Sequence, residues 1–175
     1  MTELVSRAAL LVCAVPLLVL GACSGPIETR AGLQGAGLPQ GATIALVETD
    51  GPLSDGARQA VASELERQGF TVAEAGTVRV LVALAERPAS LAVLGSDGAV
   101  VSSAKHRKLL QGCADRTQRL SLVAERSDGQ VTRAWAEEYH CKAALEETLQ
   151  PLAAQAVAHL AGKAPQWRQL RRGRD

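Results

Sequence analysis

The chain has 175 residues, of which 47% are hydrophobic and only 2% aromatic, and its formal net charge is +1. This length suits a single domain with a small aliphatic core. The near-neutral charge excludes a strongly basic or acidic chain, and we expect no nucleic-acid partner.

An apolar run opens the chain. Arg7 precedes it, Pro16 interrupts it, and small residues lead to a cysteine at Leu20-Gly21-Ala22-Cys23. This is the layout of a cleavable secretory signal. The run is too short for a lasting anchor, because a membrane-spanning helix needs about 20 apolar residues. We therefore predict a signal peptide over residues 1 to 22.

The four residues Leu20-Gly21-Ala22-Cys23 resemble the lipobox of bacterial lipoproteins. The resemblance implies that signal peptidase II cleaves between Ala22 and Cys23 and that Cys23 carries acyl chains such as palmitate. Two or three acyl chains hold a protein stably on a membrane. The alternative is an ordinary cleavage site beside an incidental cysteine. Ser24 lacks the aspartate associated with inner-membrane retention, so in a host with two membranes the resemblance implies an outer-membrane anchor on the periplasmic face.

The mature chain is expected to have three parts. Residues 23 to 41 combine the lipidated cysteine with a Gly- and Pro-rich stretch that we predict to be a flexible tether, with an average reach of about 24 Å. Residues 42 to 163 form the domain, and residues 164 to 175 a basic tail. The tail and a second basic cluster at 105 to 108 are typical of solvated segments. The alternative is contact with anionic lipid phosphate, lipopolysaccharide or another polyanion.

Apolar alternation and turn residues predict the strands. A helix is predicted from Ser54 to a left-handed ending at Gly69, where Phe70 closes on Leu65. A last helix carries an apolar stripe from Leu149 to Leu160, with Pro151 best placed in its first turn. The alternative is a longer helix from Ala143 that is kinked at Pro151. The expected strands are 42–48, 71–74, 77–86, a hairpin within 90–103, and a second hairpin formed by 115–126 and 130–141.

These elements predict an α+β domain in which two helices cover one face of a largely antiparallel sheet of five or six strands. In the second hairpin, Trp135, Glu137 and Tyr139 fall on one face, which we interpret as a half-covered sheet surface. The layout resembles small envelope lipoprotein domains, including the lipopolysaccharide-assembly lipoprotein. No motif beyond the lipobox carries that resemblance, so it transfers no functional residue.

Four cysteines leave one pair for a disulfide. Cys13 departs with the signal and Cys23 takes the lipid, so Cys113 and Cys141 remain in an oxidising compartment. A hairpin centred near residue 127 sets them roughly opposite each other, and we predict a disulfide between them. The alternatives are two buried free thiols or a redox-active pair.

The sequence offers little catalytic chemistry. His106, His140 and His159 lack the spacing of metal ligands, and no nucleophile elbow, phosphate loop or dinucleotide motif is present. We expect no catalytic residue, no metal site and no cofactor. The favoured hypothesis is a non-catalytic envelope lipoprotein that binds an envelope protein or lipopolysaccharide. The alternative is a small periplasmic hydrolase with an unrecognised site built from Asp, Glu or His.

Overall fold

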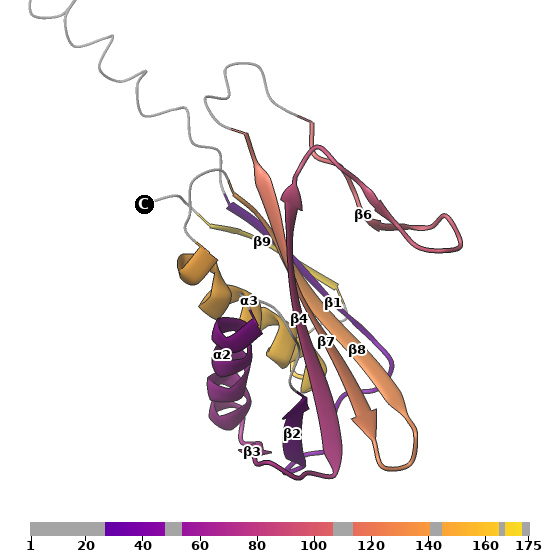
Figure 1. The fold of residues 1–175 in the computed structure, drawn as a ribbon, viewed down its shortest axis with the longest axis vertical. Coiled ribbons are helices and arrows are strands. Elements are labelled where there is room, and N and C mark those ends of the chain that lie inside the picture. Colours follow the sequence, from indigo (N-terminus) through magenta and orange to yellow (C-terminus); the bar gives the residue numbers. More distant parts are fainter. Residues whose placement is uncertain (1–26, 48–53, 107–113, 141–144, 165–166, 173–175) are drawn as a thin grey trace, which may run out of the picture.

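The computed structural model contains a seven-stranded sheet with two helices on one side and a two-stranded hairpin on the other (Figure 1). The structure describes residues 27–47, 54–106, 114–140, 145–164 and 167–172. The strand order of the sheet is β3-β2-β4-β7-β8-β1-β9. The elements are β1 (Ile27–Gln34), β2 (Thr43–Val47), α2 (Ser54–Arg67), β3 (Thr71–Val72), β4 (Val78–Pro88), β5 (Val93–Leu94), β6 (Val100–Ser102), β7 (Arg116–Arg126), β8 (Val131–His140), α3 (Leu145–Leu160) and β9 (Trp167–Arg172).

The α+β class agrees with the sequence prediction, but the sheet is mixed. β2 pairs in parallel with both β3 and β4, whereas the other ladders of the large sheet are antiparallel. Residues 73 to 77 carry the chain from β3 past the start of β2 into β4. A Cβ at Gly76 would lie 2.5 Å from the carbonyl oxygen of Thr43. Glycine therefore permits this close crossing, and the crossing makes β4 run parallel to β2.

The first strand corrects the tether prediction. β1 covers residues 27 to 34 and pairs with β8 on one side and β9 on the other. Gly32 lies directly opposite Trp135, and a Cβ at this glycine would come within 3.0 Å of the indole Nε1. The glycine that suggested flexibility thus makes room for a bulky neighbour. Residues 23 to 41 are therefore not a tether throughout, because β1 belongs to the sheet.

The other end of the domain also differs from the sequence prediction. β9 lies within residues 164 to 175, which were expected to form a basic tail, and it pairs with β1 at the edge of the sheet. Together β1 and β9 raise the strand number of the large sheet to seven, although β5 and β6 pair separately. The folded domain is correspondingly longer than residues 42 to 163.

The core lies between the sheet and the two helices. Alternate residues of the central strands are buried on the helix side, in agreement with the period-two pattern of the sequence. α2 ends as predicted: Gly69 has a φ of 91°, and the Phe70 N–H donates to the Leu65 carbonyl at 3.0 Å. The strand residues of the hydrophobic core are Ala31, Ile44, Val78, Val80, Val82, Leu120, Leu122, Ala124, Ala134 and Ala136.

The last helix begins earlier than the sequence predicts. α3 starts at Leu145, so Pro151 lies inside the helix instead of in its first turn. Proline has no N–H to donate to the carbonyl of Glu147, four residues earlier. The face of α3 that carries Leu152 and Ala156 is fully buried, and this packing offsets the missing hydrogen bond.

Candidate interaction site

The segment from Ala89 to Ala104, here called the arm, contains β5 and β6. It leaves the sheet at the end of β4 and stands on the side opposite the helices (Figure 1). The predicted hairpin is confirmed, since β5 and β6 pair antiparallel. Its turn is closed by the Gly95 N–H, which donates to the Ala99 carbonyl at 2.8 Å, and Gly98 adopts a φ of 77°.

Exposed apolar side chains concentrate on the arm. The arm provides five of the seven large hydrophobic residues that are exposed in the described part of the chain. Leu94 is 59% exposed and Val100 is 63% exposed, while Asp97 is the arm's one charged residue. Contiguous exposed apolar surface marks contact sites on folded proteins. The five residues are Leu91, Val93, Leu94, Val100 and Val101.

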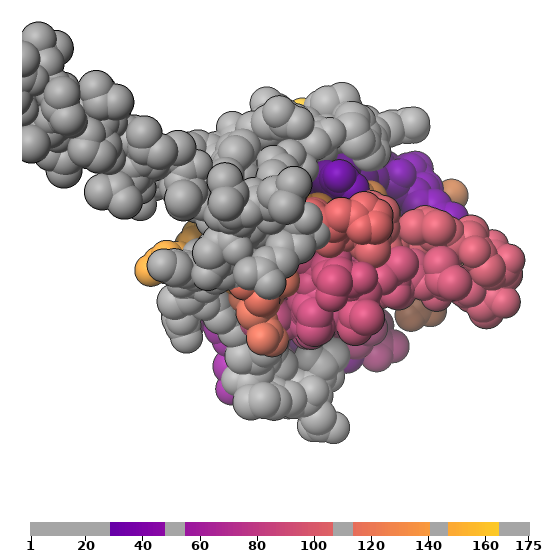
Figure 2. All heavy atoms as spheres, turned by 90° about the horizontal axis from the view of Figure 1, so that it is seen from above, coloured from indigo at the N-terminus to yellow at the C-terminus, as the bar shows by residue number. Residues whose placement is uncertain are grey.

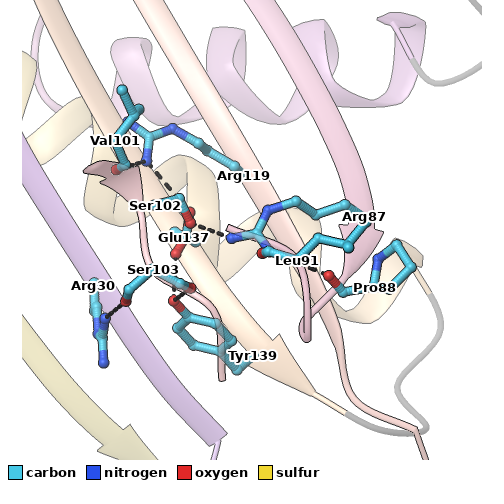
Figure 3. A network of polar contacts seen from close by, with 10 residues as sticks. All are labelled: Arg30, Arg87, Pro88, Leu91, Val101, Ser102, Ser103, Arg119, Glu137 and Tyr139. Carbon is cyan, nitrogen blue, oxygen red and sulfur yellow. Dashed lines mark hydrogen bonds and ion pairs between the residues drawn. The ribbon is translucent and has the colours of Figure 1, made fainter. Parts of the chain in front are cut away.

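Arg87, near the end of β4, binds both the outgoing and the returning segment of the arm. Its guanidinium donates to the carbonyl of Leu91, which precedes β5, and to the hydroxyl of Ser102, which ends β6 (Figure 3). Ser102 is itself buried. One planar side chain therefore holds the outgoing and the returning segment together at the base of the arm.

Two further arginines bind the returning chain. Arg30 on β1 donates from Nη1 to the Ser103 hydroxyl at 3.1 Å, and Arg119 on β7 donates from Nη1 to the Val101 carbonyl at 3.3 Å (Figure 3). The Arg119 guanidinium also lies 4.3 Å from the centre of the Trp135 ring. The three arginines come from three strands and meet on the helix-free face.

Glu137 is the anion at the centre of this arrangement. It is only 2% exposed, and strand register places it between Arg30 and Arg119. Its Oε2 lies 3.3 Å from Nη1 of Arg119, and its Oε1 accepts the Tyr139 hydroxyl at 2.7 Å. The cations compensate the cost of burying this carboxylate. The clamp, meaning Arg30, Arg87, Arg119, Glu137 and Tyr139, therefore combines charge neutralisation with attachment of the arm.

Tyr139 is buried at the base of the arm. Its hydroxyl lies 3.3 Å from the Ser103 carbonyl oxygen, and the Arg30 guanidinium lies 5.1 Å from its ring centre. Burial raises the pKa of Tyr139, and the neighbouring Glu137 carboxylate raises this pKa further, whereas Ser103 and Arg30 lower it. The phenol is thus held neutral. The interpretation of this face of β8 as half covered agrees with the position of the arm.

A small hollow lies beside the base of the arm. Its volume is about 150 Å³, and Ser90, Lys105, His106 and Asp115 are among its lining residues. Small-molecule sites usually occupy roughly 300 to 1,000 Å³. The Asp115 carboxylate is held by Lys105, whose Nζ lies 2.6 Å from Oδ2. The hollow is thus smaller than most small-molecule sites, and Lys105 pairs with one of the two carboxylate oxygens of Asp115.

The other histidines do not join this hollow. His140 and His159 are buried within the domain. In the described ranges, no group of three His, Cys, Asp or Glu side chains could hold a metal ion. No helix in those ranges is long and apolar enough to cross a membrane.

The predicted lipidation and disulfide sites lie outside the described residues. These are Ala22 and Cys23 at the cleavage site and the pair Cys113 and Cys141. The β7–β8 ladder ends with Arg116 opposite His140. Cys113 is three positions before the first of these residues and Cys141 is one position after the second.

Sequence reasoning missed the clamp. Arg30 lay in the predicted tether, Arg87 directly follows the predicted strand 77–86, and Arg119 looks like an ordinary solvated charge within the strand 115–126. The alternation of charged and aromatic residues on β8 was the one available signal. It could not identify partners that arrive from three other strands.

No protein-family model and no curated protein matches the sequence. A PelC dodecamer from Paraburkholderia phytofirmans shares 16% identity over 75% of this chain and 97% of that chain, with a TM-score of 0.49. A single-residue variant of that protein gives 14% identity, 75% and 96% coverage, and a TM-score of 0.46. A PDZ domain protein from Parabacteroides distasonis gives 11% identity, 83% and 39% coverage, and a TM-score of 0.49. Likenesses this distant bear on neither activity nor partners.

Proposed function

We propose that the protein is an envelope lipoprotein, anchored through acyl chains on Cys23, whose domain faces the periplasm and binds without catalysing a reaction. The lipobox resemblance supports the anchor and its placement on the outer membrane. The concentration of exposed apolar side chains on the arm carries the proposal of binding. The arm is the contact element, and an envelope protein or lipopolysaccharide is its expected partner class.

The clamp supports this function for the arm. Burying a carboxylate costs free energy unless cations and hydrogen-bond donors surround it. In this chain Glu137, Arg119 and Tyr139 form such a cluster, and Arg119 also donates to the arm's backbone at the Val101 carbonyl. The cluster thus holds apolar side chains out in water, away from the core. A fixed position in solvent suits a contact element.

The experiment compares two double variants of the C-terminally tagged lipoprotein in envelope extracts. Leu94→Asn with Val100→Asn changes the arm, and Leu81→Asn with Val131→Asn changes exposed apolar residues of the sheet. We expect the arm variant to lose at least about tenfold in recovery of envelope protein or lipopolysaccharide, since two apolar contacts are removed. The sheet variant should match the unchanged chain. Equal recovery by both variants would contradict binding through the arm.

A further inference from the structure

We infer that the arm's partner is the lipid surface itself, and that the arm lies in the headgroup region of the membrane that holds the anchor. The inference rests on the proposed function, because it assumes the anchor at Cys23. For the contact made by the arm it favours the lipid surface over an envelope protein or lipopolysaccharide. Three observations carry it: the short distance from the anchor to the sheet, the position of the arm, and the composition of the arm.

The anchor is close to the sheet. Cys23 precedes Ile27, the first residue of β1, by four positions. A fully extended chain spans at most about 3.6 Å per residue, so Cys23 lies within about 14 Å of β1. β1 is held by ladders on both sides, to β8 and to β9. The domain therefore cannot move away from the membrane without breaking its sheet.

The arm starts at the end of the sheet nearest the anchor. Register places Glu28 of β1 opposite Tyr139, Tyr139 opposite Thr117, and Thr117 opposite Arg87. This row joins the first residues of β1 to the last residues of β4, directly before the arm. Seen from that end, the arm stands out sideways from the molecule as a separate lobe (Figure 2). Its exposed side chains thus lie beside the anchored end.

The composition of the arm fits lipid better than protein. Residues 89 to 104 contain leucine, valine, alanine, glycine and serine, together with the lone charge of Asp97. The arm has no Trp, Tyr or Arg, the residues that contribute most of the binding energy of protein interfaces. Trp and Tyr also favour membrane interfaces, so it is the exposed leucines and valines that point to lipid. Membrane-surface segments need apolar side chains beside a polar boundary.

The backbone of the arm limits its depth. Within the described residues, β5 and β6 pair only with each other, so each strand has one edge without a neighbouring strand. An unsatisfied backbone group costs several kcal/mol in hydrocarbon but can bind water among the headgroups. The arm therefore lies in the interfacial region and does not span the bilayer.

The test uses the mature chain with Cys23→Ser, so that no acyl chain contributes, and vesicles of phosphatidylethanolamine and phosphatidylglycerol. Partition into vesicles is measured by co-flotation for this chain, for the Leu94→Asn/Val100→Asn form and for the Leu81→Asn/Val131→Asn form. We expect the arm changes to lower the partition coefficient about tenfold, and the sheet changes less than about twofold. High salt should leave most binding intact, because the contact is apolar. Both variants change exposed residues, and equal thermal midpoints verify their folding.

Several results would overturn the inference. The first is that the chain does not bind vesicles. The second is that the arm changes do not lower vesicle binding, and the third is that high salt abolishes it. A photo-crosslinker at Val100 that joins the arm to an envelope protein or to a second copy of the chain would also overturn it. In that case arm-dependent recovery from extracts would remain, and the proposed function would stand without the lipid contact. Loss of acylation would instead remove the proposed function.

Discussion

At the scale of single residues, Glu137 and Tyr139 form the least solvent-exposed part of the clamp. The Tyr139 hydroxyl donates to Oε1 of Glu137, so ionising the phenol would place two anions 2.7 Å apart beneath the arm. Like charges at this distance in a buried site disfavour ionisation. Arg30, near the tyrosine ring, opposes this effect only in part, because the pKa of Tyr139 is raised overall.

Tyr139 is the chain's one tyrosine, so tyrosinate absorbance reports its titration directly. Because its folded pKa is raised, the stability from the neutral phenol is complete below the unfolded value of about 10 and is lost as pH rises through the folded value. We expect a midpoint above that of the denatured chain, and Glu137→Gln should lower it. Identical midpoints in native and denatured protein would contradict the burial of Tyr139 by the arm.

Gly32 is the residue on which the position of β1 can be tested. A side chain at this position would meet the indole of Trp135, so Gly32→Val should lower the free energy of unfolding by about 1 to 3 kcal/mol. Urea denaturation measures the loss. In a Trp135→Leu background the same change should cost clearly less. An equal cost in both backgrounds would show that Gly32 and Trp135 are not neighbours.

At the scale of elements, the arm depends on the clamp for its position. Arg119→Met removes the donor to Val101 and leaves Glu137 with less compensation, so we expect a loss of roughly 2 to 4 kcal/mol in stability. Hydrogen exchange should become faster across residues 91 to 103. Arg133 is an exposed arginine on the face of β8 that also carries Glu137. The matched control Arg133→Met should change stability by less than about 0.5 kcal/mol. Unchanged hydrogen exchange across residues 91 to 103 in the Arg119 variant would contradict the role of the clamp in positioning the arm.

The predicted disulfide would link the two segments that flank the hairpin of β7 and β8. We expect the non-reduced mature protein to show a Cys113–Cys141 linkage by mass spectrometry, and reduction to lower stability by roughly 3.6 kcal/mol for a closed loop of about 29 residues. The register, with Arg116 opposite His140, leaves both cysteines within a few residues of the last pair. Two thiols that alkylate under native oxidising conditions would rule the linkage out.

The elements also show what the sequence could predict. Local signals sufficed for the end of α2 at Gly69 and for both hairpins, since turn residues and alternation act over a few positions. β1 could not be predicted, because the need for a glycine at position 32 comes from the packing of Trp135, which is about a hundred positions away in the sequence. The clamp was missed for the same reason, since register alone brings Arg30 beside Glu137. Pro151 was misplaced because packing outweighed the local preference of proline.

At the scale of the whole molecule, the first residues of β1 and the base of the arm lie at one end of the sheet, while the helices cover one face (Figure 1). The proposal that the arm contacts the membrane requires lipid on Cys23, which precedes β1 by four positions. Acylation of Cys23 is therefore the central claim.

Metabolic labelling with palmitate tests this claim most directly. The account predicts that the unchanged chain and a Cys13→Ala control are labelled and fractionate with membranes, and that Cys23→Ala abolishes the label and leaves an unprocessed or soluble product. Palmitate label that persists in the Cys23→Ala chain would contradict the account.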